Sequence, residues 1–135
     1  MDIVNDRELL FYQKLGELFY AIAASDKVVR ESEYKMLSQL VEKKWKQQDE
    51  YTDQFGTDAA YQIAIVFEWF DYERMDADVC FESFADYYKK NKNLFYGTRK
   101  ALIMNTVINI AEAFSGTNKS ELIMITKLKL LFNNN

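Results

Sequence analysis

Carboxylates are the side chains best able to do chemistry in this chain, because histidine is absent and cysteine occurs only once. Without an imidazole there is no Ser-His-Asp or Cys-His triad and no histidine-liganded zinc site. Cys80 lies between Val79 and Phe81 with no cationic neighbour in sequence, which is typical of a half-buried structural residue rather than a reactive thiol. We therefore expect a protein that is not an enzyme.

Asp26 and Glu33 flank the start of a predicted helix. Their carboxylates can accept backbone N–H hydrogen bonds near the positive end of the helix dipole, and this is the structural interpretation. The alternative is a divalent cation such as Ca²⁺ or Mg²⁺, which prefers several oxygen ligands at once. Two carboxylates with loop carbonyls would form a weak, water-rich metal site, and no other cofactor is expected.

An acidic stretch follows in the middle of the chain, where seven acidic residues and one basic residue, Arg74, occupy positions 68–86. The predicted partner-binding residues in it are Asp71, Glu73, Asp76, Asp78, Glu82 and Asp86. Such a face can be merely solvated, or it can dock a basic protein partner or cations. A hydrolase using paired carboxylates is a third hypothesis, which needs two acids converging in an apolar pocket.

The elements that must position these residues are predicted to be helices. Apolar residues make up 49% of the 135 residues, proline is absent and glycine occurs four times, so the turn residues that a β-sandwich needs are missing. Helices are expected over about 5–24, 30–45, 57–69, 76–90, 94–113 and 118–132. We predict a single all-α domain spanning residues 1–135.

Several of these helix ends carry capping residues. Asn5 with Glu8, and Asn118 with Glu121, have the spacing of a capping box, and Asp76 can cap the fourth helix. Gly56 is placed to start the third helix and Gly116 to end the fifth. Apolar periodicity predicts inward-facing side chains, among them Tyr61, Ala64, Ile65 and Trp69 in the third helix, Val79 in the fourth and Ala101 in the fifth.

Charge and hydropathy narrow the location and the partners. The net charge is −4 with an isoelectric point near 4.9, which argues against a nucleic-acid partner and leaves a protein partner as the expectation. No apolar run approaches the roughly 18 residues of a transmembrane helix, and the N-terminus lacks the pattern of a signal peptide. With a single cysteine, these features favour the cytoplasm.

A short internal repeat relates the two halves of the chain. Residues 22–33 align with residues 110–121, with Ile-Ala at one end of each copy and Ser-Glu at the other. Each copy is expected to form a helix, a tight loop and a second helix. The repeat predicts two helical hairpins related by a pseudo-two-fold axis, each covering the apolar face of the other.

The first copy resembles the TerB-like (tellurite-resistance protein B-like) family in the segment Leu18–Asp26, which is followed by Val29 and Glu33. The resemblance implies a compact bundle of about six or more helices built from two such hairpins. It also implies a binding or adaptor module associated with stress or tellurite resistance.

The chain departs from the family pattern at three positions. Lys27 stands where the family has glycine, Arg30 where it has a small capping residue, and Phe114 replaces the acid of the second copy. The family's use of acidic residues for divalent metal can therefore be carried over only to Asp26 and Glu33.

Overall fold

The computed structural model describes residues 3–45, 59–113 and 118–133, with side chains from residue 6 onward. These residues form six α-helices and no strand, as the sequence predicts. The helices are α1 (Ile3–Ala23), α2 (Glu31–Lys43), α4 (Gln62–Tyr72), α5 (Ala77–Lys90), α6 (Gly97–Glu112) and α7 (Lys119–Asn133), and a 3₁₀ helix, η2 (Lys92–Leu94), joins α5 to α6.

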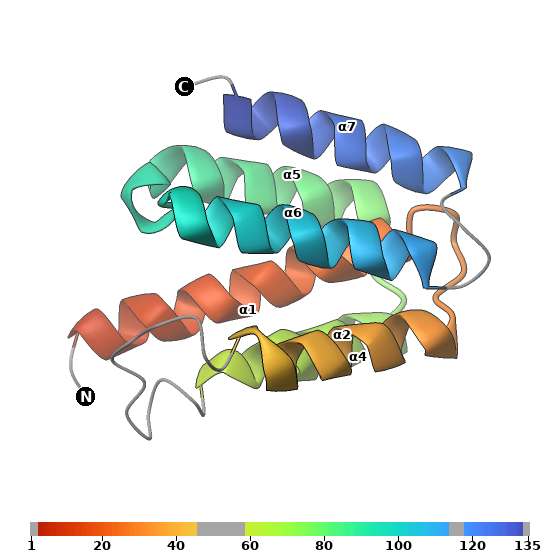
Figure 1. Cartoon of the computed structure of the whole chain (residues 1–135), viewed down its shortest axis with the longest axis horizontal. Coiled ribbons are helices and arrows are strands. Elements are labelled where there is room, and N and C mark those ends of the chain that lie inside the picture. Colours follow the sequence, from red (N-terminus) through yellow and green to blue (C-terminus); the bar gives the residue numbers. More distant parts are fainter. Residues whose placement is uncertain (1–2, 46–58, 114–117, 134–135) are drawn as a thin grey trace.

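Helix α1 is the centre of the bundle. It packs against α4, α5, α6 and α7, and it lies between the α2 and α4 pair and the α5 and α6 pair (Figure 1). Its C-terminal part, Leu18–Ala23, is an unbroken apolar run and is buried on every side. A helical segment that is apolar all round must be enclosed by other elements, which explains why four helices pack against this one.

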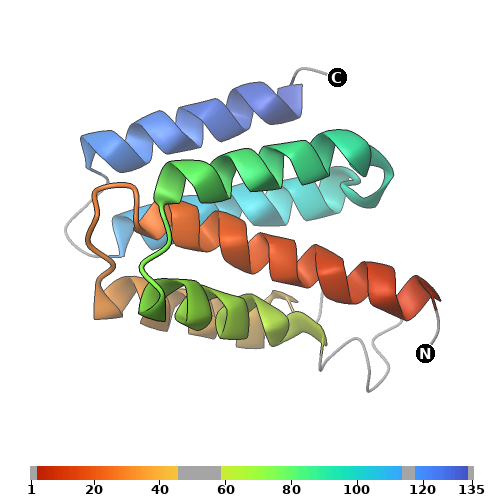
Figure 2. The same ribbon diagram turned by 180° about the vertical axis from the view of Figure 1, so that it is seen from behind.

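The remaining helices form two opposite edges. Helix α7 lies along one edge, while α2 and α4 lie along the other, as the views from both sides show (Figures 1 and 2). The α1–α2 loop, the α4–α5 turn and the start of α7 meet at one end of the bundle. Helix α2 packs on α4 and α6, and α7 packs on α6 and α1.

Aromatic rings and one buried side-chain hydrogen bond lie in the interior. Phe95 stands at the centre of a ring cluster, with centroids 5.0 to 6.2 Å from those of Phe11, Phe84, Tyr87, Tyr88 and Phe132. The indole N–H of Trp45 donates to Thr106 Oγ1 at 3.0 Å, which links the end of α2 to α6. Such contacts allow a polar atom to be buried at little cost.

Glu8, which the sequence predicts to be part of a helix cap, instead forms an ion pair within the bundle. Arg99 is buried, and its Nη2 donates to both carboxylate oxygens of Glu8, at 2.8 and 3.1 Å. The predicted Asn5 and Glu8 capping box is therefore wrong. Helix α1 already begins at Ile3, and Glu8 serves as the counter-ion of α6.

Other helix ends match the capping residues. Asp76 Oδ2 accepts the Val79 N–H at 2.9 Å, and Asn118 and Glu121 form a complete capping box at the start of α7. The predicted roles of Gly56 and Gly116 lie outside the described residues. None of the helices in the described part of the chain is long and apolar enough to cross a membrane.

The inward faces of three helices differ from the predictions. In α4 the buried residues are Ile63 and Phe67, whereas Tyr61, Ile65 and Trp69 face outward. The run Ile63–Phe67 is apolar on every side, so periodicity alone does not select a face. Val79 in α5 and Ala101 in α6 are likewise exposed.

Gly16 sets the closest approach between α1 and α4. A Cβ at this position would lie 2.6 Å from the Ile63 carbonyl oxygen and 2.9 Å from Val66 Cβ. We expect Gly16→Ala to lower the free energy of unfolding by about 1 to 3 kcal/mol, because backbone cannot move aside as a flexible side chain can. Urea unfolding followed by circular dichroism measures this change.

Gly97→Ala is the matched control, because a Cβ there meets nothing within 4 Å. This variant should be neutral or slightly stabilising, since alanine favours a helix over glycine. Equal stability losses for the two variants would contradict the close packing of α1 on α4.

Candidate functional site

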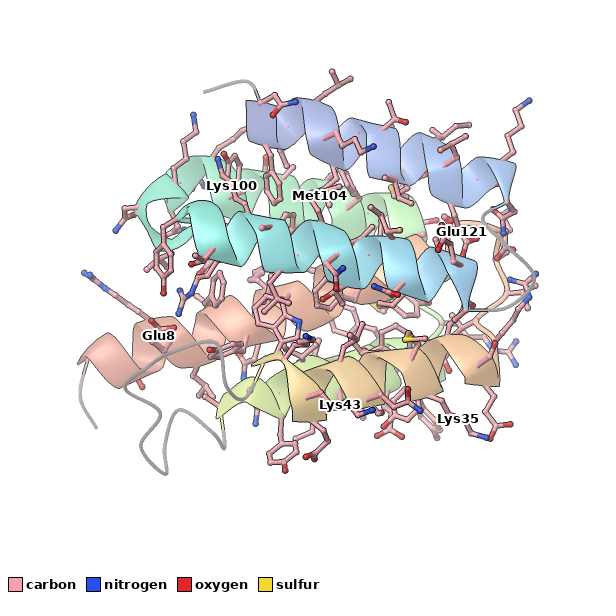
Figure 3. The ribbon with its side chains drawn as sticks, viewed as in Figure 1. Glu8, Lys35, Lys43, Lys100, Met104 and Glu121 are labelled. Carbon is pink, nitrogen blue, oxygen red and sulfur yellow. The ribbon has the colours of Figure 1, made fainter. Side chains whose placement is uncertain are left out.

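Two buried glutamates lie at the starts of helices that are far apart in sequence. Glu33 is in the first turn of α2 and is 0% exposed, while Glu121 is in the first turn of α7 and is 1% exposed. Glu33 Oε1 accepts the Arg30 N–H at 2.9 Å, and Glu121 Oε1 accepts the Asn118 N–H at 3.2 Å. The two carboxyls thus occupy equivalent positions, three residues after each N-cap. Figure 3 shows Glu121 where α7 begins.

Asp26 joins the α1–α2 loop to the start of α7. One of its carboxylate oxygens, Oδ2, accepts from Asn118 Nδ2 at 2.7 Å and from Arg30 Nη1 at 3.0 Å. Its other oxygen, Oδ1, accepts the Val28 N–H at 3.1 Å. Asp26 therefore ties the α1–α2 loop to the start of α7 through hydrogen bonds to ordinary protein donors.

Burial makes ionisation of Glu33 costly. The pKa of Glu33 is raised from 4.5 to about 8, first by burial and then by a side-chain hydrogen bond with Glu121. The Arg30 backbone N–H and its guanidinium act in the opposite direction. Because this pKa lies above 7, Glu33 is mostly protonated at neutral pH and can donate its proton toward Glu121.

Each glutamate of the pair also has one carboxylate oxygen without a hydrogen-bond donor in the described part of the structure. No described residue donates a hydrogen bond to Oε2 of Glu33 or to Oε2 of Glu121, although both atoms are buried. Such atoms can be satisfied by a shared proton or by a cation. They cannot act on a substrate from solution, because neither carboxyl reaches the surface.

The structure separates the two predicted metal ligands by role. Asp26 binds protein donors, whereas Glu33 faces Glu121, a residue that the prediction did not include. The internal repeat could have identified Glu121, because it places this residue opposite Glu33. Among the residues with described side chains, no three acidic or cysteine groups converge as metal ligands.

The predicted acidic face divides into two parts. Asp71, Asp76 and Asp78 line one depression of about 520 Å³, together with Lys27 and Arg74. Asp86 lines a second depression more than two helical turns further along α5, beside Lys14 and Lys90. Glu73 and Glu82 are exposed and line neither depression. The strongest concentration of carboxylates is therefore the α4–α5 turn.

Both cations of the first depression have unusual backbones. Lys27 has a φ of 70° and Arg74 a φ of 53°, in the left-handed region that favours glycine. These conformations reverse the chain at the ends of α1 and α4. The Tyr20 hydroxyl also donates to the Met75 carbonyl at 2.7 Å, which holds the α4–α5 turn against α1.

Cys80 is buried, and burial raises the pKa of its thiol to about 12. The protonated thiol is a poor nucleophile, as expected for a structural cysteine.

Comparison of the chain with protein-family models, with curated proteins and with solved structures gave no match. The geometry of the described residues is therefore the basis for any functional conclusion.

The shared proton predicts a pH dependence of stability. Because the folded pKa of Glu33 lies above its unfolded value, the native state binds more protons between pH 4.5 and about 8. Stability is therefore highest below this window and falls as pH rises through it. We expect Glu33→Gln to reduce this fall, which is of the order of several kcal/mol, in urea unfolding at pH 5 to 9.

Glu31→Gln is the control, because Glu31 is exposed and pairs only with Lys35 at 3.4 Å among the described contacts. The chain has no histidine that would titrate in the same window. The same pH slope in wild type and in Glu33→Gln would show that the glutamates do not share a proton.

Proposed function

We propose that this protein is a non-enzymatic helical binding module of the TerB-like type, which engages a positively charged protein partner through the carboxylates of the α4–α5 turn. The observation that carries the proposal is the position of Asp71, Glu73 and Asp78, which are exposed beside outward-facing aromatic side chains of α4. An association with stress or tellurite resistance belongs to the same proposal through the family resemblance.

We call the α4–α5 turn with Asp71, Glu73, Asp76 and Asp78 the acidic turn. It has the properties of a preformed docking surface. Tyr20 holds it to the core, Asp76 caps α5, and the Met75 N–H donates to the Phe70 carbonyl at 3.1 Å. A rigid surface loses little conformational entropy on binding. Its charge attracts basic partners and steers their approach.

Two features support the TerB-like part of the proposal. The left-handed backbone at Lys27 provides a physical reason for the glycine that the family has at this position. In addition, Glu33 and Glu121 each lie three residues after a helix N-cap, at positions that the internal repeat aligns.

The proposed absence of catalysis agrees with the accessibility of the acids. Glu33 and Glu121 are close enough to share a proton but are buried, whereas the carboxylates of the α4–α5 turn are exposed to water. General acid and base chemistry needs a carboxyl that both reaches a substrate and has a shifted pKa.

Charge reversal tests the proposed partner surface. The triple variant Asp71→Lys, Glu73→Lys and Asp78→Lys reverses three exposed acids of the turn and spares the helix cap Asp76. As a probe we choose a fluorescent amphipathic peptide of leucine and lysine. The variant should bind it about threefold to a hundredfold more weakly than wild type in fluorescence anisotropy, because each of three exposed pairs contributes about 0.2 to 1 kcal/mol.

The control variant reverses Asp6, Glu31 and Glu112, which are exposed and lie outside the acidic turn. It changes the net charge by the same amount and should bind the probe like wild type. Equal weakening in both triple variants would show that the net charge alone controls binding. It would contradict the proposal that the acidic turn is the binding surface.

A second candidate function is the binding of a divalent cation between Glu33 and Glu121. The open Oε2 atoms favour it, since a cation could replace the shared proton and accept both lone pairs. Because the described side chains supply few ligands there, carbonyls or waters would complete the shell. The metal would then stabilise the junction of α2 and α7 rather than catalyse a reaction.

Melting temperatures test this candidate. Ca²⁺, Mg²⁺ or Mn²⁺ at ten times its dissociation constant should stabilise the wild type by about 1.4 kcal/mol, which is a shift of a few degrees. Glu121→Gln should abolish the shift, and Glu31→Gln should retain it. No shift and no calorimetric heat at millimolar metal would exclude this function.

A further inference from the structure

The outer face of α4 is aromatic and exposed. Tyr61, Ile65, Trp69 and Tyr72 recur at steps of four, four and three residues, so they form one stripe along the helix. Trp69 is 58% exposed and Tyr72 is 80% exposed, and their rings stack with centroids 6.2 Å apart. Contiguous exposed aromatic residues are typical of a protein interface.

Helix α4 itself carries only negative charge, and the exposed Arg74 lies beyond its C-terminal end. Helix α4 contains no basic residue, and its acids Glu68 and Asp71 are exposed, as is Glu73 directly after it. We call this surface of stripe and carboxylates the α4 face. It fits an amphipathic helix whose apolar side chains are flanked by cations.

Helix α7 presents a surface of that kind. Leu122, Ile123 and Leu130 are exposed on its outer side. Lys119, Lys127 and Lys129 are exposed around them, while Glu121, the one acid of this helix, is buried. We call this surface the α7 face. Its apolar residues and its charge complement those of the α4 face.

The two faces lie on opposite edges of the molecule, as both views show (Figures 1 and 2). We infer that the α7 face of one copy of this chain docks on the α4 face of a second copy. Because the two surfaces differ and point apart, each copy keeps one face open after docking. The contact is therefore head-to-tail and extends into chains or rings rather than a closed two-fold dimer.

This inference rests on the proposed function, since it names the basic partner of the acidic surface. One helix on each side gives a small interface, so the association is weak, with a dissociation constant of about 1 μM to 1 mM. Its charge complementarity makes it sensitive to salt.

The test uses sedimentation velocity with two variants that leave the charge unchanged. Trp69→Gln with Tyr72→Gln removes the α4 face, and Leu122→Gln with Leu130→Gln removes the α7 face. All four side chains are exposed, so the fold should persist. Wild type should form larger species as its concentration rises at low salt, whereas each variant alone should remain monomeric.

Mixing the two variants gives the decisive result. The first variant retains its α7 face and the second its α4 face, so the mixture should form one-to-one dimers that grow no further. The control variant Leu10→Gln with Val28→Gln removes exposed apolar side chains elsewhere and should associate like wild type.

Wild type that stays monomeric at about 1 mM in low salt would overturn the inference, as would variants that associate like wild type or a mixture without dimers. The peptide experiment separates this failure from that of the proposed function. Probe binding that is lost on reversal of the acidic turn keeps the proposed function even where self-docking fails. Self-association without probe binding would contradict the proposed binding of basic partners in general. It would leave the docking of the α7 face on the α4 face supported.

Discussion

The burial of the C-terminal part of α1 determines the rest of the architecture. The segment Leu18–Ala23 is apolar on every side, so it must be covered by other helices all round. Gly16 permits the backbones of α1 and α4 to approach closely, since a Cβ there would lie 2.6 Å from the Ile63 carbonyl oxygen. Because α1 occupies the centre, α4 and α7 become outer helices on opposite edges and keep one face each toward water.

The same arrangement brings the glutamate pair together. The loop after α1 turns at Lys27 and starts α2 at Arg30, while α7 starts beside the same loop. Each start places a glutamate against the helix N-terminus, where its first oxygen meets a backbone N–H. The second oxygen of each glutamate is buried without a hydrogen-bond donor among the described residues, and this burial raises the pKa of Glu33.

The sequence predicted the helices well and their faces less well. Local rules found the cap at Asp76 and the capping box of Asn118 and Glu121, because both are contacts within four residues. Periodicity did not predict the buried face of α4, because the run Ile63–Phe67 is apolar on every side. Which side is buried there depends on Gly16 of α1, a contact distant in sequence.

The site was predicted in part for the same reason. Asp26 and Glu33 were visible as acids near a helix start, and the structure places both at the junction. Their partners come from the start of α7, and Glu121 was not predicted as part of the site, although the repeat aligns it with Glu33. The pairing of Arg99 with Glu8 left no local pattern, because 91 positions separate the two residues.

The enclosure of Cys80 has a practical consequence. Its thiol is the single sulfhydryl of the chain, and it is buried beneath the surface of α5 and protonated up to about pH 12. A thiol-specific reagent can therefore modify it only when α5 opens away from α1. The rate of labelling would report how often this part of the bundle opens locally, and no cysteine would have to be introduced into the chain.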